Sequence, residues 1–181
     1  DGWFRNVECV PVKPPVRVPG APVGVLTLWD SPEKLGKAPD VEWRDGAVHL
    51  LDNAGLYAGP PSRDAIVRAS IRMNTDAKGP QINLRHRGDD GYRLAINPKD
   101  NYVVLGTSSH EKATNLRQWP LPRRYREDEW LRLELRAIGN QLTAVADGVT
   151  LGTITDESLS QPGGAGIFAT NGWFKEIEYL P

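Results

Sequence analysis

The stretch WLRLELRAIGNQLTAVADGVTLGTIT, residues 130–155, decides the fold class. Its first part alternates strictly, with leucine at positions 131, 133 and 135 and a charged residue at each position between them. A period of two is typical of a half-buried β-strand, whereas an amphipathic helix repeats every 3.6 residues. The dipeptides Gly139-Asn140 and Asp147-Gly148 are sequences that favour tight hairpin turns. The stretch therefore predicts an antiparallel meander of short strands.

The same pattern recurs through the chain after residue 25. DAIVRASIRMN (64–74) alternates apolar with polar residues, and QINLRHRGDDGYRLAIN (81–97) contains two strands joined by a turn at Gly88–Gly91. Asp45-Gly46 predicts another hairpin, while GGAGIFAT (163–170) and GWFKEIEYL (172–180) predict two closing strands. About eleven short strands at regular spacing indicate an all-β sandwich or barrel.

Composition narrows the classes of function. The 181 residues suit one domain, and 22 Lys plus Arg against 23 Asp plus Glu give a formal charge of −1. A neutral chain of this kind is not expected to bind nucleic acid, and no apolar stretch is long enough for a membrane-spanning helix. The one cysteine excludes an internal disulfide. Because the chain begins at Asp1 without a leader, we expect it to be a piece of a longer protein.

The two ends of the chain have nearly the same amino-acid sequence. Residues 1–11 are DGWFRNVECVP and residues 171–181 are NGWFKEIEYLP, while residues 12–24 form a Pro-rich linker. We interpret residues 1–11 as the last strand of an upstream copy and residues 25–181 as one complete domain. Alternatively, both phrases are strands of one fold. In either case residues 1–11 are expected to add to an open sheet edge, in this molecule or a neighbouring one, by strand exchange.

The order of these features resembles the concanavalin A-like lectin and glucanase jelly roll. The run from AIVRASIRM through INLRHRGDDGYRLAI and EWLRLELRAIGNQLTAVADGVTLGTI to the closing WFKEIEYL carries the resemblance over residues 25–181. Within that group it is most similar to laminin-G-like and 3-keto-disaccharide-hydrolase-like domains appended to large bacterial multidomain proteins. The resemblance implies a β-sandwich of two antiparallel sheets, a concave face that receives a glycan, and an extracytoplasmic or secreted location.

Planar donors and aromatic rings are the groups that bind sugars, because guanidinium and amide groups reach pairs of hydroxyls and rings stack on sugar faces. The strands predicted above offer a set of such residues for ligand binding: Arg85, Arg87, Tyr92, Arg93 and Trp119. Alternation places Arg85 and Arg87 on one face of one strand. The competing interpretation is that the strand arginines form cross-strand ladders with Glu134 and its neighbours.

Catalytic and metal chemistry receive little support. Glu176 and Glu178 share a strand face, as paired carboxylates of a retaining glucanase would, but the matching phrase at the front has Asn6 in place of the first glutamate. We therefore predict no catalytic residue. The three histidines lie far apart, which argues against zinc. No cofactor is predicted, although oxygen ligands for Ca²⁺ occur in turns at Asp40, Asp45, Asp52-Asn53, Asp89-Asp90 and Asp100-Asn101.

The sequence thus predicts a non-catalytic recognition module that binds a glycan or protein ligand, part of a tandem array in a larger extracytoplasmic protein. One alternative is a glycoside-processing enzyme of the 3-keto-disaccharide hydrolase type. Another is a structural domain that assembles by strand exchange.

Overall fold

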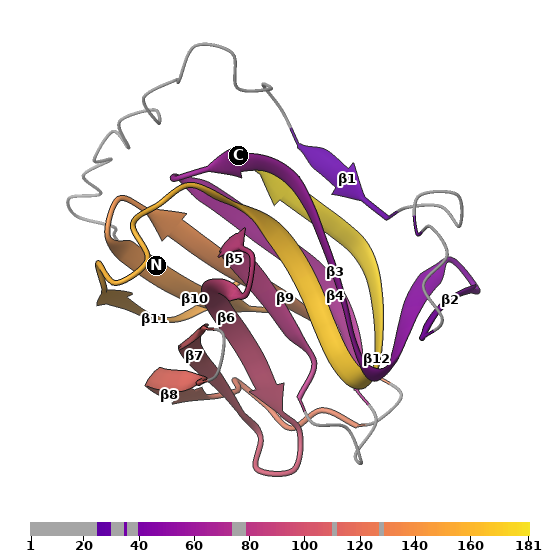
Figure 1. The fold of residues 1–181 in the computed structure, drawn as a ribbon. Helices are drawn as coiled ribbons and strands as arrows, with labels where there is room; N and C mark the ends of the chain where they lie inside the picture. Colours follow the sequence, from indigo (N-terminus) through magenta and orange to yellow (C-terminus); the bar gives the residue numbers. More distant parts are fainter. Residues whose placement is uncertain (1–24, 30–34, 36–39, 74–78, 110–111, 127–128) are drawn as a thin grey trace, which may run out of the picture.

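The longest strand, β12 (Gly163–Leu180), connects all parts of the fold. A computed structural model describes residues 25–29, 35, 40–73, 79–109, 112–126 and 129–181 (Figure 1). The first half of β12 pairs with β5 (Gln81–Arg87) and its second half with β4 (Ala65–Met73), while β3 (Ala47–Ser62) follows its other edge. The prediction of two separate closing strands is wrong, because a bulge between Ala169 and Asn171 bends one strand without ending it.

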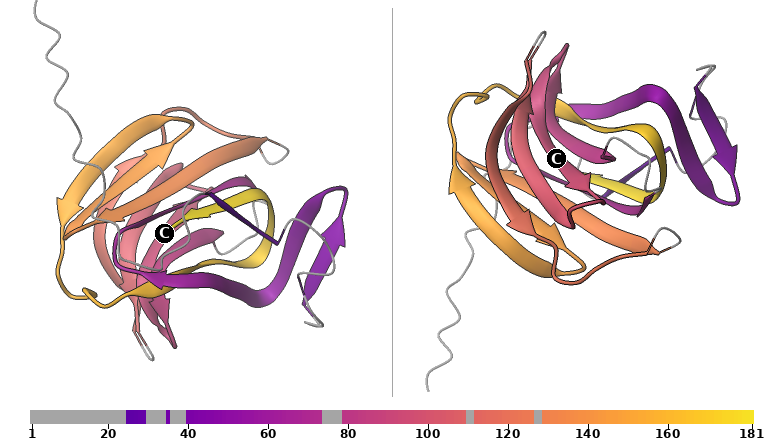
Figure 2. Two further views of the ribbon diagram at one scale, coloured as in Figure 1. Left: turned by 90° about the horizontal axis from the view of Figure 1, so that it is seen from above. Right: turned by 90° about the horizontal axis from the view of Figure 1, so that it is seen from below.

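The strands on either side of β12 form two layers. In the first layer, β11 (Val149–Thr155), β10 (Gln141–Ala146), β9 (Trp130–Ile138) and β4 lead to the second half of β12, which also pairs with β1 (Leu26–Leu28). In the second, the first half of β12 leads through β5, β6 (Asp90–Asn97) and β7 (Tyr102–Ser108) to β8 (Thr114–Pro120). Seen from above, β9–β11 lie in front, and seen from below, β5–β8 do (Figure 2). The predicted all-β antiparallel sandwich is confirmed, with twelve strands among the described residues.

The core lies between the layers and follows the predicted alternation. Leu131, Leu133 and Leu135 of β9 are fully buried, as are Val67 and Ile71 of β4. They pack with inward side chains of β5, β6, β7 and β12 in one apolar cluster. Because every second residue points inward, the residues between them form the two outer faces of the molecule.

Two predicted hairpins are confirmed. β2 (Val41–Arg44) pairs with β3, and β10 pairs with β11. Both turns are Asp-Gly dipeptides with both residues at positive φ, at Asp45-Gly46 and Asp147-Gly148. This left-handed backbone matches the twist of a two-residue hairpin.

The far edges of the two layers approach each other at β8 and β11. A Cβ on Gly152 of β11 would lie 2.3 Å from Nε1 of Trp119, which extends from β8 and packs against the core. The indole therefore takes the space of the missing side chain and closes the interior at this edge.

No helix occurs among the described residues, so none there is long and apolar enough to cross a membrane. The predicted strand at residues 1–11 and the linker at 12–24 lie outside the described residues.

We predict that Gly152→Ala lowers the free energy of unfolding by about 1–3 kcal/mol, because the new methyl group would overlap the indole ring of Trp119. Urea titration followed by tryptophan fluorescence measures this. Thr150→Ala, an exposed position on the same strand, is the control and should change stability by less than about 0.5 kcal/mol. Equal effects of the two substitutions would contradict the packing at this edge.

Candidate functional site

One row of residues crosses the outer face of the second layer on six adjacent strands. The strand register aligns, in order from β3 through β12, β5, β6 and β7 to β8, Tyr57, Gly166, Asn83, Arg93, Gly106 and Asn115. Two of these positions, Gly166 and Gly106, have no side chain, so the surface is recessed there beside the large side chains of the row. A Cβ on Gly166 would lie 2.3 Å from the Tyr57 ring, which shows that the ring occupies the space above that strand.

Beside this row lies a cavity of about 330 Å³. We call it the polar groove, because seven of its twelve lining residues carry a planar amide, a hydroxyl or a guanidinium group. The lining residues are Asn53, Gly79, Gln81, Arg93, Ala95, Ile96, Asn97, Tyr102, Val104, Asn115, Phe168 and Thr170. Among these described residues there is no carboxylate and no histidine. The groove therefore presents hydrogen-bonding groups without an internal acid or base.

Arg93 of β6 is the central cation of the polar groove. Its Nη2 atom donates to Oδ1 of Asn115 over 2.7 Å, so the side chain reaches across β7 at the position of Gly106. Its Nε atom is buried and has no hydrogen-bond partner among the described residues. Burial lowers the pKa of Arg93 from its ordinary value. The guanidinium is thus fixed in place but incompletely paired.

A second incompletely paired donor lies next to Arg93. Asn83 of β5 is 1% exposed, and its Oδ1 accepts a hydrogen bond from Nε2 of Gln81 at 3.2 Å. Its Nδ2 atom has no partner among the described residues. Most buried donors in proteins are satisfied, so two unsatisfied donors on neighbouring strands mark this face as unusual.

Tyr57 supplies an aromatic ring at the other end of the row. The side chain is 44% exposed, and one ring face stacks on His86 with centroids 3.6 Å apart. Burial raises the pKa of Tyr57 and lowers the pKa of His86; for His86, the nearby Asp89 and Asp90 act in the opposite direction. Gly55, which pairs with Phe168 of the groove lining, lies against the same ring. Tyr57 is therefore next to the Gly55–Phe168 pair, although it does not itself line the polar groove.

The structure separates the residues that the sequence analysis grouped for ligand binding. Arg85 and Arg87 do not share a face, so that expectation is wrong. Arg85 adopts φ 50° at a bulge between Leu84 and Arg87, and the extra residue breaks the alternation. Arg85 is 3% exposed and donates to the carbonyl oxygens of Arg63, Leu159 and Gly139, whereas Arg87 is exposed at the end of its strand.

Two further members of that set also lie away from the polar groove. Tyr92 is fully buried, and its hydroxyl donates to Oδ1 of Asp156 over 2.6 Å. Trp119 closes the interior at Gly152. Only Arg93 of the five predicted ligand-binding residues lines the groove. Gln81, Asn83 and Tyr57 were missed, although the alternation in QINLRHR places Gln81 and Asn83 on the face opposite Ile82 and Leu84.

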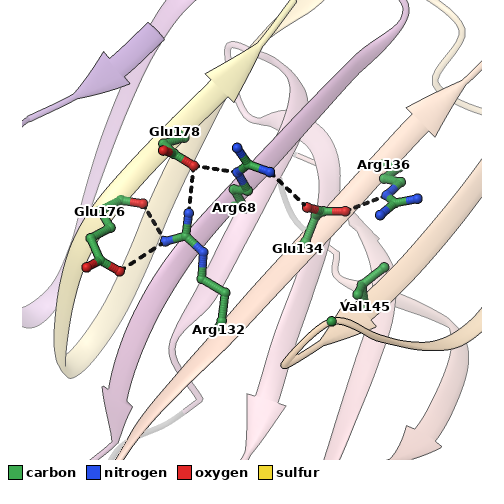
Figure 3. Close-up of a pocket in the computed structure, with 8 residues that line it drawn as sticks. Arg68, Arg132, Glu134, Arg136, Val145, Glu176 and Glu178 are labelled. Carbon is green, nitrogen blue, oxygen red and sulfur yellow. Dashed lines mark hydrogen bonds and ion pairs between the residues drawn. The ribbon is translucent and has the colours of Figure 1, made fainter. Parts of the chain in front are cut away.

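A second surface covers the outer face of β12, β4 and β9 (Figure 3). We call it the charged face; it borders a cavity of about 630 Å³ and consists of Arg68, Ser70, Arg132, Glu134, Arg136, Glu176 and Glu178. Arg68 lies between Glu178 and Glu134, and Arg136 bonds the other oxygen of Glu134. The predicted cross-strand ladder with Glu134 is confirmed for Arg68 of β4, whereas Arg136 pairs with Glu134 within β9 itself.

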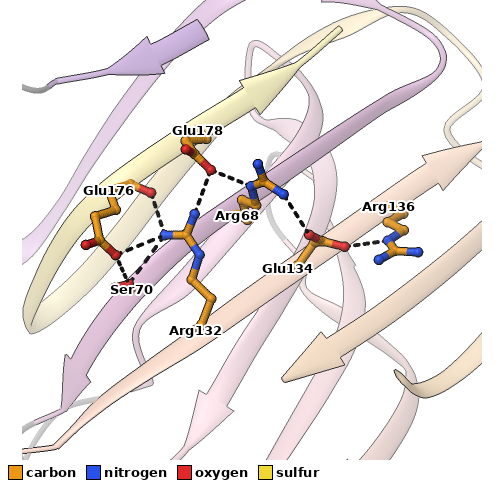
Figure 4. Close-up of polar contacts among 7 residues, drawn as sticks. All are labelled: Arg68, Ser70, Arg132, Glu134, Arg136, Glu176 and Glu178. Atoms are coloured by element: carbon orange, nitrogen blue, oxygen red, sulfur yellow. Dashed lines mark hydrogen bonds and ion pairs between the residues drawn. The ribbon is translucent and has the colours of Figure 1, made fainter. Parts of the chain in front are cut away.

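Arg132 joins the remaining members of the charged face (Figure 4). Its Nη2 donates to Glu178 over 2.7 Å, and its Nη1 donates to the backbone carbonyl of Glu176 over 2.6 Å and lies 3.5 Å from the Glu176 carboxylate. Glu176 sits in a bulge of β12 with φ 50°, and its carboxylate also accepts from Ser70. Three arginines thus pair with three glutamates, and each carboxylate has a cationic partner.

Aromatic rings and cations alternate beyond this network on the same outer face. Arg72 of β4 lies over the rings of Trp173 at 4.7 Å and Trp130 at 5.3 Å, and His49 of β3 stacks on Trp173 with centroids 4.0 Å apart. These contacts are between neighbouring strands and tie β3, β12, β4 and β9 together.

No group of three His, Cys, Asp or Glu side chains that could hold a metal ion occurs anywhere in the described part of the chain. Calcium binding stays a prediction.

Comparisons with known proteins identify the fold. No family model and no curated protein matches the sequence. Among solved structures, the carbohydrate-binding module CBM66 from Bacillus subtilis aligns over 88% of this chain and 96% of its own, with a TM-score of 0.68 and 11% identity. The galectin LEC-6 from Caenorhabditis elegans aligns over 74% and 96%, with a TM-score of 0.58 and 12% identity.

An enzyme shares the same architecture. A prokaryotic β-1,3-1,4-glucanase (lichenase) from a mouse hindgut metagenome aligns over 78% of this chain and 83% of its own, with a TM-score of 0.63 and 11% identity. At such identities the likeness concerns the fold, and folds of this kind carry different activities. The described residues therefore have the concanavalin A-like jelly-roll fold that the sequence resemblance implied.

We predict that Arg85→Met lowers the free energy of unfolding by about 3 kcal/mol, because three carbonyl oxygens lose their shared donor. Arg87→Met removes the same charge at an exposed position and should change stability by less than about 0.5 kcal/mol. Chemical denaturation of both variants decides whether Arg85 is structural. A stable Arg85→Met protein would contradict that role.

We predict that the stability of the folded chain depends on pH through His86. Its pKa is lowered in the folded chain, so the unfolded chain binds the proton more readily, and stability decreases as pH falls from about 7 to 5. His86→Gln removes this contribution. Urea midpoints across that range should fall more steeply for the native sequence than for the variant, and parallel curves would show that His86 does not contribute.

Proposed function

We propose that this chain is a non-catalytic carbohydrate-binding module and that the polar groove is its glycan site. The observation that carries the proposal is the lining of that groove, where planar amide and guanidinium donors surround a cavity of about 330 Å³. Sugar hydroxyls occur in adjacent pairs, and planar groups with two hydrogen-bonding atoms match such pairs.

Aromatic side chains support the same assignment. Phe168 lines the cavity, and the partly exposed ring of Tyr57 lies against Gly55, which pairs with Phe168. The C–H face of a sugar ring is apolar and stacks on aromatic side chains, while its hydroxyls extend outward. A floor of this kind beside amide donors offers both halves of a sugar-binding surface. Solved proteins of the same fold include a carbohydrate-binding module and galectins.

The carboxylates argue for binding rather than catalysis. Hydrolysis of a glycosidic bond needs two carboxyl groups around the scissile bond, one of them able to donate a proton. The described lining of the polar groove has none. On the charged face, Glu134, Glu176 and Glu178 each form an ion pair with an arginine within the fold, which gives these carboxylates a structural partner.

The wider setting of the module rests on the sequence. The proposal places it outside the cytoplasm, in tandem with at least one similar copy, with residues 1–11 as a strand that adds to a sheet edge. Deleting residues 1–24 and measuring mass by light scattering separates strand exchange from independent folding.

We predict that the chain is retarded in affinity electrophoresis through gels that contain plant, algal or bacterial polysaccharides. Gln81→Ala and Tyr57→Ala should each weaken binding about fivefold to tenfold, because each removes one hydrogen bond or one stacking surface. Thr150→Ala, on the other layer, is the control and should bind like the native sequence.

The outcomes of that experiment separate the classes of function. Retardation that the groove variants reduce supports the proposal. No retardation by any polysaccharide would refute it. Release of reducing sugar from a bound polysaccharide, measured in parallel, would show an enzyme instead.

A further inference from the structure

The arginines on the two outer faces of the molecule differ in whether they form ion pairs. On the charged face, Arg68, Arg132 and Arg136 all contact glutamates. Arg85, inside the molecule, donates to three carbonyl oxygens. Arg93 in the polar groove bonds only the neutral amide oxygen of Asn115 and forms no ion pair with any described residue.

An unpaired and partly buried guanidinium is energetically unfavourable. Taking a charge out of water costs free energy unless an opposite charge or hydrogen-bond acceptors replace the water. Arg93 has lost part of its hydration, as the lowered pKa indicates, and its Nε atom lacks an acceptor. The buried Nε atom is not reached from the groove, but an anion bound beside the other nitrogen atoms of the guanidinium would offset the cost of the buried charge.

The position of Arg93 suits a carboxylate. Asn115 holds one end of the guanidinium through Nη2, which limits its rotation before a ligand arrives. A planar guanidinium bonds a carboxylate through two parallel hydrogen bonds, and such charge-assisted bonds are stronger than neutral ones. Among the polar groups around Arg93, Asn97 is already bonded to Asp100 and Tyr102. The Gln81 amide and the Tyr102 hydroxyl each make one hydrogen bond within the protein and can also bond hydroxyl groups of the same sugar.

We propose that the polar groove selects acidic glycans, with the carboxylate of a uronic acid residue bound to Arg93. The inference rests on the proposed function and narrows it to one class of ligand. A formal charge of −1 on the whole chain gives no general attraction for polyanions, so the selectivity must come from this one site.

The test compares each acidic polysaccharide with its own neutral form. Polygalacturonate, alginate and hyaluronan are used before and after chemical reduction of their carboxyl groups to primary alcohols, and binding to the full 181-residue chain is measured by calorimetry. We expect at least one acidic form to bind, and reduction to weaken that binding about tenfold to a hundredfold, through loss of the charge-assisted bonds.

Variants locate the effect at Arg93. Arg93→Met should weaken binding of the acidic form by a similar factor while leaving the reduced form little changed, and Arg93→Lys should recover part of the loss because it keeps the charge without the planar fork. Arg117→Met is the matched control, since it removes a positive charge from an exposed position on β8, two strands away from Arg93 and outside the groove lining. It should bind like the native sequence.

The outcomes distinguish this inference from the proposed function. Equal binding of acidic and reduced forms, or binding of neutral polysaccharides alone, would overturn the acidic selectivity and leave the carbohydrate module standing. Binding of no polysaccharide would overturn both. Equal losses in Arg93→Met and Arg117→Met would indicate general charge attraction and also overturn it. If Arg93→Met does not fold by circular dichroism, the comparison of acidic with reduced forms on the native chain still decides.

Discussion

The fold depends on the hydrogen bonding of one continuous strand. β12 pairs with β3 along one edge and with β5 and then β4 along the other, so both layers share its backbone. A strand that serves two layers must bend, and bulges next to Gly163, Ala169 and Lys175 allow this without loss of pairing. The direction in which each outer side chain points follows from these bulges.

The bulge at Glu176 links this constraint to the charged face. An extra residue between Lys175 and Glu178 turns the Glu176 carbonyl out of the ladder with β4, and Arg132 of the next strand donates to it. The same guanidinium bonds Glu178. The network therefore satisfies the backbone that the bulge exposes, which gives these arginines and glutamates a structural role. The polar side chains of the polar groove satisfy no bulge of this kind, and two buried donors on that face, Asn83 Nδ2 and Arg93 Nε, have no hydrogen-bond partner among the described residues.

Most of the fold could be predicted from the regular alternation of apolar and polar residues. The residues of the candidate site were harder to predict, because β-bulges interrupt that alternation. A bulge shifts every later side chain by one position, which moved Arg85 to the interior and separated it from Arg87. The second half of β3 was not predicted because Pro60 and Pro61 interrupt it. These prolines fall in a bulge of that strand, between the pairs that Ala58 and Ser62 form with β12, where missing N–H groups are tolerated. Tyr57, in that same half, was missed with it.

The size of the polar groove bears on how such a module would work. A cavity of about 330 Å³ holds only a few sugar units, and a shallow site of this size on a sheet face offers limited contact area. Affinity for a single site is then modest, since ordering the ligand offsets part of the gain from each hydrogen bond. If the upstream copy inferred from residues 1–11 is present, the Pro-rich linker at 12–24 would hold two grooves at a restricted separation. A repeating polysaccharide carries its binding unit many times, so the second groove would bind at a high effective concentration. Under the proposed function, a tandem arrangement would therefore let two weak sites act together on one long polymer.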